Sequence, residues 1–366
     1  MPIISTAQID CRVVLIIRSV LFAVLLSFLL ALLPAPACAA GTPSVTAESC
    51  IVMCQDGSVL YEKNADRRRL IASTTKLMTA LVCLENAALD ESVTAERKTC
   101  EVEGSSMYLR AGERYTVREL LLGLLLASGN DAALTLAAHT AGSQAEFAAL
   151  MNRKAQELGL ENTHYVNPHG LDAEAHYSSA RDLARLMLEC MENPDFRELT
   201  KTRAANVKGL TLLNHNKLLT LCPGCIGGKT GYTSAAGRCL VSCCERDGLL
   251  LVCVTLSDPD DWNDHMRLYD WAYAGYRMHE LGDEFSFAVP LVSGSRCEVT
   301  AVPQPGSRAV LPQDASLEIS VELPRFVFAP IEAGESAGVL TLLRNGREVY
   351  ACPLVYAEGA ELADAY

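Results

Sequence analysis

Three short groups of residues carry side chains that could act together on a peptide or an ester. The first is Ser73-Thr74-Thr75-Lys76. A serine hydroxyl is a weak nucleophile until a base lies beside it. Residues three apart share one face of a helix, so Lys76 could lie beside the Ser73 hydroxyl. The same four residues would also suit a serine that caps a helix and a lysine that faces solvent.

The other two groups pair a hydroxyl with an amide or a lysine. Ser128-Gly129-Asn130 could relay a proton and hold a substrate amide, although an ordinary helix boundary has the same composition. Lys229-Thr230-Gly231 could recognise a carboxylate, because a lysine lies beside a hydroxyl and glycine lets a substrate backbone approach closely. A glycine-rich turn before a strand is the alternative for this third group.

The elements that must position these groups are a sheet and several helices. Residues 51–61 read as a hairpin, and strand character returns at 240–242 and 249–256. The apolar spacing predicts helices over 73–86, 117–141, 146–158 and 262–278. Strands, then helices, then strands and a helix indicate a sheet with helices packed on it and a helical insertion.

The composition changes near residue 282. Short apolar alternations recur from Phe285 onward, and Asn345-Gly346 between two of them is a strong hairpin signal. We therefore expect a separate small β domain over residues 282–366.

The first forty residues have the pattern of a secretory signal peptide. Arg12 and Arg18 precede an apolar run from Val20 to Leu33, and the small residues Ala35 to Ala40 follow it. An uncleaved membrane anchor is the alternative, but it would place Arg18 inside the apolar run at a cost in free energy. We expect residues 1–40 to be removed and the protein to be exported.

The net charge and the cysteine content limit the possible partners and disulfides of the protein. The formal net charge is −13, so phosphates would meet net repulsion and nucleic acid is a poor partner. Of fifteen cysteines, thirteen lie outside the leader, an odd number that leaves at least one thiol unpaired in a monomer. Most lie in hydrophobic segments, as small buried residues do.

One cysteine pair has a recognised spacing. Cys222 and Cys225 form a C-x-x-C, which could be a disulfide or a redox pair. A zinc site would need a second pair of similar spacing, and the adjacent Cys243-Cys244 is not one. The sequence does not decide which cysteines pair.

Together and in this order, Ser-x-x-Lys, Ser-x-Asn and Lys-Thr-Gly resemble the signature of the penicillin-recognising serine enzymes. Flanking sequences make the chain similar to the serine D-alanyl-D-alanine carboxypeptidases, the low-molecular-mass penicillin-binding proteins. The resemblance covers about residues 45–280, and the β region resembles that family's C-terminal domain. The flanking matches are Tyr61–Ala65, Ile71–Ala80, Leu125–Ala133, Asn167–Leu171, Lys229–Thr233 and Ala236-Gly237.

The resemblance implies an α/β (α+β) transpeptidase/β-lactamase-like domain over residues 41–281, with an antiparallel sheet flanked by helices. A small all-β, β-sandwich-like domain would follow over 282–366. The implied reaction removes the terminal D-alanine from peptidoglycan pentapeptides that end in D-Ala-D-Ala. It would take place outside the cytoplasm through an acyl-serine intermediate, with no metal or other cofactor, and β-lactams would inhibit it covalently.

The same resemblance assigns roles by motif. Ser73 would be the acylated nucleophile, Lys76 its general base and Ser128 the proton relay. The backbone N–H groups of Ser73 and Tyr232 would form the oxyanion hole. A neutral Lys76 is required, so we expect burial and the nearby Lys229 to lower its pKa from the usual value near 10.4. The implied substrate-binding residues are Asn130, Lys229, Thr230, Gly231 and Tyr232.

Two features depart from the family pattern. The acidic tail Ala357–Tyr366 is not the amphipathic helix with which the family usually ends, so we expect that membrane anchor to be absent from this chain. An additional arginine that could clamp the substrate carboxylate is not identified, and Arg238 and Arg267 are candidates by position alone.

Three rival interpretations stay open at this point. A β-lactamase would use a glutamate to activate water, and Glu189 with Asn193 loosely matches that spacing inside a helical run. A metal peptidase could use His169, Asp172 and His176, although a turn leading to a helix explains that segment better. A non-catalytic cell-wall-binding protein of the same fold is the rival outside the enzymes.

Overall fold

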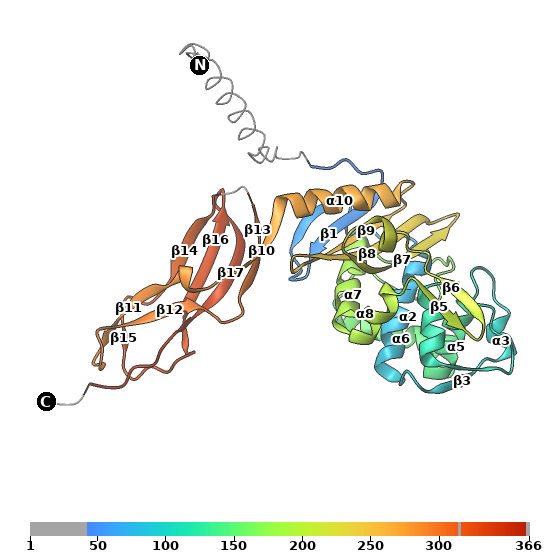
Figure 1. Ribbon diagram of the computed structural model, residues 1–366, viewed down its shortest axis with the longest axis horizontal. Coiled ribbons are helices and arrows are strands. Elements are labelled where there is room, and N and C mark those ends of the chain that lie inside the picture. The colour runs from blue at the N-terminus through green and yellow to red at the C-terminus, as the bar shows by residue number, and fades with distance from the viewer. Residues whose placement is uncertain (1–41, 314–315, 364–366) are drawn as a thin grey trace, which may run out of the picture. The chain divides into compact units, whose positions relative to one another are not determined.

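The computed structural model describes residues 42–313 and 316–363, so the expected signal peptide lies outside the described residues. The larger part of the described chain is built on one antiparallel sheet (Figure 1), whose strands follow the order β2-β1-β9-β8-β7. The bounds are β1 Ser49–Cys54, β2 Val59–Lys63, β7 Cys225–Thr233, β8 Gly237–Arg246 and β9 Leu249–Leu256.

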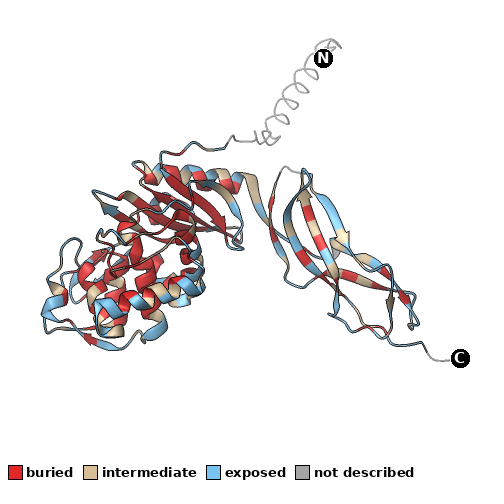
Figure 2. Cartoon of the chain, turned by 180° about the vertical axis from the view of Figure 1, so that it is seen from behind, coloured by how far each residue is buried: buried red, intermediate tan, exposed pale blue. Residues whose placement is uncertain are grey.

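The central strands of this sheet are buried on both faces. Successive side chains of a strand point to opposite faces, so Val252 of β9 joins one hydrophobic cluster and Leu251 joins another. This is why β9 is apolar along its whole length rather than alternating. Figure 2 shows the buried residues concentrated in the sheet and in the helices next to it.

Helices cover both faces of the sheet. The cluster on one face includes residues of α2, α4, α5, α6, α7 and α8, and the cluster on the other includes residues of α9 and α10. Their bounds are α2 Lys76–Asn86, α4 Val117–Leu125, α5 Asn130–Ala141, α6 Gln144–Glu157, α7 Ala180–Glu192, α8 Pro194–Lys201, α9 Leu218–Leu221 and α10 Asp261–Gly275. Smaller elements are η1 Ala72–Thr75, α3 Arg97–Cys100, β3 Ser92–Thr94, β4 Arg114–Thr116, β5 Ala204–Val207 and β6 Leu210–Leu213.

In the described residues after α10, the regular structure is β strand apart from one short turn of 3₁₀ helix. A six-stranded sheet has the order β14-β16-β17-β12-β11-β15, and β10 pairs with β13. A third hydrophobic cluster lies here, from Leu281 to Ala360. The bounds are β10 Tyr276–Glu280, η2 Asp283–Phe285, β11 Phe287–Val292, β12 Glu298–Pro303, β13 Arg308–Pro312, β14 Glu318–Glu322, β15 Val327–Phe328, β16 Ser336–Arg344 and β17 Arg347–Tyr356.

The expected fold class is confirmed, with two corrections to individual elements. The helix expected over 117–141 is two helices, because Ser128 adopts a positive φ of 59° and breaks the run between α4 and α5. The last helix ends at Gly275, and Tyr276–Glu280 is a strand paired with 308–312. That pairing is made with residues distant in sequence, so the local periodicity could not reveal it.

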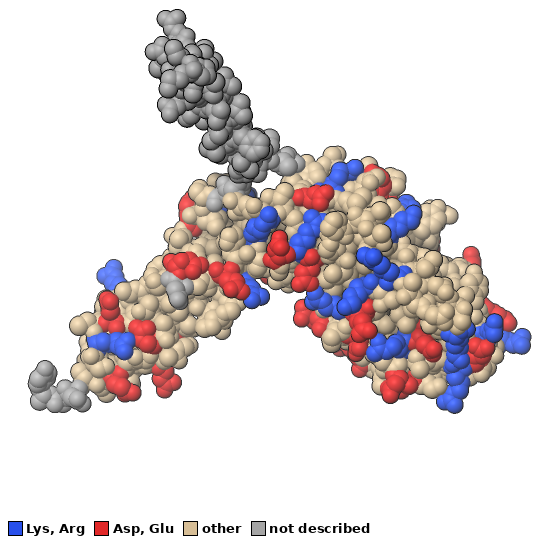
Figure 3. Space-filling model, in the orientation of Figure 1, with Lys and Arg blue, Asp and Glu red and all other residues tan. Residues whose placement is uncertain are grey.

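The surface bears charges of both signs. On the face shown in Figure 3, acidic and basic side chains are interspersed. Within residues 42–313 and 316–363, no helix is long and apolar enough to cross a membrane.

Candidate active site

Ser73 and Lys76 lie where the 3₁₀ turn η1 runs into helix α2. Ala72, immediately before Ser73, has a positive φ of 46°, an uncommon conformation for a residue with a side chain. Lys76 is the first residue of α2, and its Nζ lies 2.8 Å from Ser73 Oγ. The spacing of three residues therefore does what the sequence predicts and brings the amine onto the hydroxyl.

The Lys76 amine has two further partners. Its Nζ lies 2.7 Å from Asn130 Oδ1 and 2.7 Å from the carbonyl oxygen of His169. Lys76 is fully buried, whereas Ser73 is partly exposed. The amine is thus fixed by three oxygens, and only the serine end of the arrangement reaches solvent.

Ser128 lies in the short connection between α4 and α5, and Asn130 begins α5. The Lys229 Nζ donates to Ser128 Oγ at 3.0 Å and to the carbonyl of Thr230 at 2.8 Å. Asn130 Nδ2 donates to the Glu103 carbonyl at 2.6 Å, which orients the amide so that its oxygen faces Lys76. All three motifs therefore meet in one place.

Strand β7 presents the third motif to the serine. A Cβ placed on Gly231 would lie 3.0 Å from the Ile71 carbonyl and 3.0 Å from the Ser73 nitrogen. A glycine at this position therefore allows β7 to approach the turn that carries the serine closely. Thr230 is half-buried and Tyr232 is exposed, so both lie on the side of the site that solvent can reach. The Lys-Thr-Gly group lies inside a strand and is not a turn before one.

Burial controls the charges of the two lysines. Removal from water disfavours the ammonium form. It holds the pKa of Lys76 well below its usual range, with a further lowering from the charge of Lys229 and an opposing effect of Asp131. Burial lowers the pKa of Lys229 to about 7. The expected depression of the Lys76 pKa therefore agrees with the geometry.

The sequence offers the segment around His169 as an Asn-Pro-His-Gly-Leu match and as possible metal ligands, but it does not indicate that the His169 carbonyl contacts Lys76. Asn167 Oδ1 accepts hydrogen bonds from the backbone N–H groups of His169 and Gly170, at 3.2 and 2.7 Å. Gly170 has φ +91°, and a Cβ there would lie 1.9 Å from the Ala72 carbonyl. The segment is therefore packed directly against the turn that carries Ser73.

The residues proposed for a metal peptidase all have protein partners. His169 Nδ1 lies 3.2 Å from the Leu171 N–H, His176 Nε2 lies 2.8 Å from Thr75 Oγ1, and Asp172 accepts from Thr233 Oγ1 at 2.9 Å. Across residues 42–313 and 316–363, no group of three His, Cys, Asp or Glu side chains is arranged to hold a metal ion.

Glu189 and Asn193, the candidates for a β-lactamase site, do not form a catalytic pair. Glu189 is an exposed residue of α7, and the Asn193 side chain accepts from the first N–H groups of α8. This pair therefore does not reproduce the water-activating glutamate of a β-lactamase.

The two candidate arginines differ in position. Arg238 of β8 is the direct cross-strand partner of Tyr232, and its Nη2 donates to Asp261 Oδ1 at 2.6 Å. Arg267, in the middle of α10, is paired with Asp260 and Asp264 at the start of the same helix. Of the two, only Arg238 lies beside the third motif.

Comparison with known proteins gives a consistent answer. The sequence profile described as D-alanyl-D-alanine carboxypeptidase matches residues 37–260. The chain is 32% identical over 336 residues to the D-alanyl-D-alanine carboxypeptidase DacF of Bacillus subtilis, covering 87% of this chain and 86% of the relative. It is 36% identical over 265 residues to a D-alanyl-D-alanine carboxypeptidase of a Streptomyces species, covering 65% of this chain and 91% of the relative.

The solved structures agree with the sequences. Penicillin-binding protein 5 from Haemophilus influenzae superimposes with a TM-score of 0.76 at 25% identity, covering 87% of this chain and 99% of that one. The profile matches more than half of the chain, and the Bacillus relative matches it over nearly its full length. The chain therefore belongs to the D-alanyl-D-alanine carboxypeptidase family.

Proposed function

We propose that this chain is an exported serine carboxypeptidase that removes the terminal D-alanine from peptidoglycan pentapeptides through an acyl-serine intermediate. β-Lactams would acylate the same serine. The observation that carries the proposal is the set of three oxygens around Lys76 Nζ, contributed by Ser73, Asn130 and His169.

A neutral lysine amine has two N–H donors and one lone pair. Asn130 Oδ1 and the His169 carbonyl are both acceptors, so they take the two N–H groups. The lone pair is then left to accept the Ser73 hydroxyl proton, and burial favours the neutral amine that this requires. Lys76 is thus poised as the general base of acylation.

Acylation forms one bond and breaks another. Ser73 Oγ attacks the carbonyl carbon of the penultimate D-alanine while its proton passes to Lys76. The backbone N–H groups of Ser73 and Tyr232 are proposed to hold the oxyanion. The peptide C–N bond then breaks, and the proton held by Lys76 passes through the Ser128 hydroxyl to the leaving D-alanine nitrogen, which leaves Lys76 neutral again. The products of acylation are free D-alanine and an ester on Ser73.

Recognition of the substrate terminus falls to β7. Lys229 and Thr230 are proposed to bind the terminal carboxylate, with Gly231 giving the substrate backbone room and Asn130 holding the peptide amide. Arg238 lies next to Tyr232 and is held there by its ion pair with Asp261. A carboxylate near Lys229 would raise the pKa of this buried amine, so substrate binding favours the ammonium form it needs.

Deacylation returns the enzyme to its starting state. Water attacks the ester carbon and gives a proton to Lys76, and Ser73 Oγ regains a proton as the ester C–O bond breaks. The peptide leaves one D-alanine shorter, with a new carboxylate. No redox partner enters this cycle.

The test is release of D-alanine from a diacyl-lysyl-D-alanyl-D-alanine tripeptide by the mature chain. We expect release that survives a chelator, disappears in Ser73→Ala, and persists in the control Ser234→Ala, which changes an exposed serine of the β7–β8 turn. We also expect benzylpenicillin to add its mass at Ser73.

Other outcomes of this experiment would favour one of the three alternative functions. Release that stops with chelator would favour a metal peptidase. Rapid turnover of benzylpenicillin without D-alanine release would favour a β-lactamase. A stable penicillin adduct without either turnover would leave a cell-wall-binding protein.

A further inference from the structure

Three cysteines meet where β7 begins. Cys222 follows α9, Cys225 is the first residue of β7, and Cys244 lies on β8 as the cross-strand partner of Cys225. The Sγ atoms of Cys222 and Cys244 are 3.7 Å apart. A disulfide has an S–S length of about 2.05 Å, so the two sulfurs would need to close by about 1.7 Å. The turn between Cys222 and Cys225 is held to β8, because Glu245 N–H donates to the Gly224 carbonyl at 2.9 Å.

A cation lies against one of these thiols. Arg246 Nη2 is 3.5 Å from Cys222 Sγ, and Arg246 Nε donates to the Pro223 carbonyl at 2.9 Å. The hydrogen bond from Cys244 and the charge of Arg246 lower the pKa of the Cys222 thiol to about 7, against the opposing effects of burial and, to a smaller extent, of Asp270. A thiolate is the nucleophile in disulfide exchange.

This cluster differs from the other buried cysteines of the chain. Burial raises the pKa of Cys50, Cys54 and Cys83 to about 12, which leaves them unreactive. Cys243, next to Cys244, faces the opposite side of the sheet and belongs to the other hydrophobic cluster. Cys222 itself is buried, but Pro223 and Gly224 beside it are exposed, so the turn borders solvent.

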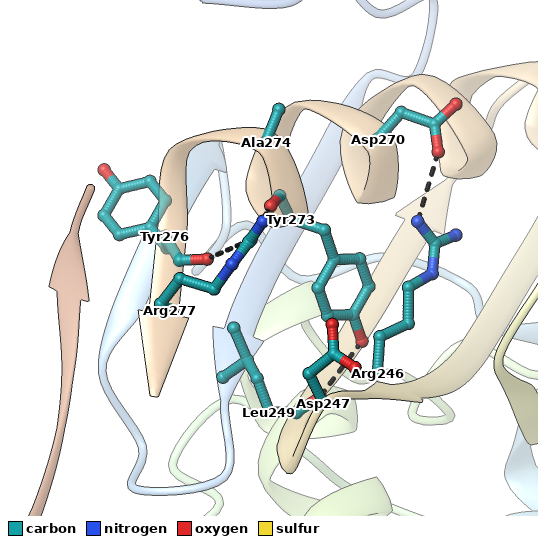
Figure 4. A pocket seen from close by; sticks show the side chains of 8 residues that line it. All are labelled: Arg246, Asp247, Leu249, Asp270, Tyr273, Ala274, Tyr276 and Arg277. Carbon is teal, nitrogen blue, oxygen red and sulfur yellow. Dashed lines mark hydrogen bonds and ion pairs between the residues drawn. The ribbon is translucent and has the colours of Figure 1, made fainter. Parts of the chain in front are cut away.

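Arg246, which contacts Cys222, also lines a pocket of about 300 Å³ (Figure 4). It carries charges of both signs, because Arg277 lines it together with Asp247 and Asp270. Tyr273, on its wall, donates to the Cys244 carbonyl at 2.9 Å. Paired cations and carboxylates suit the amino and carboxylate groups of an amino-acid-derived ligand.

We propose that Cys222 and Cys244 form a thiol–disulfide exchange site that accepts a low-molecular-mass, amino-acid-derived disulfide as oxidant. The Cys222 thiolate attacks one sulfur of the disulfide, and one small thiolate leaves. Cys244 then attacks the Cys222 sulfur of the mixed disulfide, and the second small thiolate leaves. The two protons of the protein thiols end on the two small thiols, and two electrons pass from the protein to the disulfide.

The experiment uses the mature chain with Cys100→Ser and Cys297→Ser, which removes the most exposed remaining thiols. The reduced protein is incubated with oxidised and reduced glutathione in varying ratio, quenched in acid, alkylated and mapped by mass spectrometry. We expect a loss of two hydrogens and a peptide in which Cys222 is joined to Cys244. Benzylpenicillin acylation of each variant checks that it is folded.

The variants separate the two steps. Cys222→Ser should give neither the glutathione adduct nor the internal disulfide. Cys244→Ala should stop at a glutathione adduct on Cys222, and the control Cys243→Ala should behave as the parent. A Cys225–Cys244 link with Cys222 still free would overturn the assignment. So would the absence of any internal disulfide in the parent at every ratio.

The role of Arg246 has its own readout. Raising the Cys222 pKa from 7 to 8 would cut its thiolate fraction at pH 7 about fivefold. Because a thiolate of higher pKa is also more nucleophilic, we expect Arg246→Gln to slow alkylation of Cys222 by about twofold to fivefold, and Asp270→Asn to accelerate it. The control Arg277→Gln changes a pocket arginine with no contact to the thiol and should leave the rate unchanged. Equal rates in all four proteins would contradict an activated Cys222.

Discussion

Lys76 and Lys229 are both buried, yet each has a different hydroxyl within hydrogen-bonding distance. A buried lysine is costly when charged, so two in one site indicate a function other than stability. Ser73 has the Lys76 amine and Ser128 has the Lys229 amine. In the proposed mechanism Lys76 is accordingly the base for the nucleophile, and Lys229 is the cation for the substrate terminus.

Replacing Lys76 by methionine tests the base. Methionine fills similar space and has no lone pair of comparable basicity, so we expect acylation by benzylpenicillin to slow by about 10²- to 10⁴-fold. The measurement is the rate at which the adduct mass appears. Lys154→Met is the matched control, since Lys154 pairs with Glu85 and Glu157 on the helical surface. An unchanged rate in Lys76→Met would exclude Lys76 as the base.

Replacing Lys229 by methionine tests the linkage between charge and stability. Its pKa falls from an ordinary 10.5 to about 7 in the folded chain. Between these values the unfolded chain binds a proton that the folded chain does not, so wild-type stability rises with pH across this window. Lys229→Met lacks that penalty. We expect it to be more stable at pH 7 by about 1–3 kcal/mol, after loss of its hydrogen bonds.

The measurement is urea denaturation of both proteins from pH 7 to pH 10.5. The advantage of Lys229→Met should shrink steadily as the pH rises, while D-alanine release by the variant is strongly reduced. A stability difference that does not vary with pH would mean that Lys229 is not the titrating group.

At the scale of elements, the sequence predicts local geometry better than distant pairing. The Ser73–Lys76 contact agrees with helical spacing, and the 51–61 hairpin agrees with a turn between two apolar runs. The break at Ser128 depends on a single positive φ inside a strongly helical pattern. The strand 276–280 exists because of its partner 308–312, which no local signal contains.

Part of the site was also beyond prediction from side-chain types. The third acceptor at Lys76 is a backbone carbonyl, and any residue at position 169 carries one. Its placement depends on Asn167 and Gly170, which shape the loop rather than perform chemistry. Residue types therefore indicate the reactive groups, whereas the contacts that orient them come from the packing of the loop on η1.

Gly170→Ala tests this loop. A Cβ there would lie 1.9 Å from the Ala72 carbonyl, so either the loop or the serine turn must shift. We expect slower acylation and a loss of stability of about 2–4 kcal/mol, from the clash and the positive φ together. The control Gly159→Ala has a similar backbone, φ +64°, with nothing within 4 Å of the new Cβ.

The control should lose about 1 kcal/mol from the backbone alone and acylate at the normal rate. Penicillin adduct formation and thermal unfolding measure both effects. If the two variants behaved alike, strain at a positive φ rather than contact with the serine turn would explain the result.

At the scale of the whole molecule, the two sheets have separate hydrophobic clusters. The third cluster begins at Leu281, and among the residues the structure describes the fully buried members of the two clusters around the first sheet end at Tyr273. The half-buried Tyr276, Met278 and Val310 also pack against one of these two clusters. The Streptomyces relative is covered over 91% of its length by only 65% of this chain. The boundary at 281/282 stays a prediction of the sequence, and a shortened chain can test it.

A chain that ends at Leu281 tests this boundary. Every motif of the site lies before it, so we expect acylation by benzylpenicillin at nearly the full-length rate. Its stability should fall by about 1–3 kcal/mol, because β10 loses its hydrogen bonds to β13 and becomes an unpaired edge. A second chain ending at Gly275, where α10 stops, removes that edge and serves as the control. If both shortened chains folded, judged by thermal unfolding, yet neither acylated, the β region would be part of the catalytic machinery rather than a separate domain.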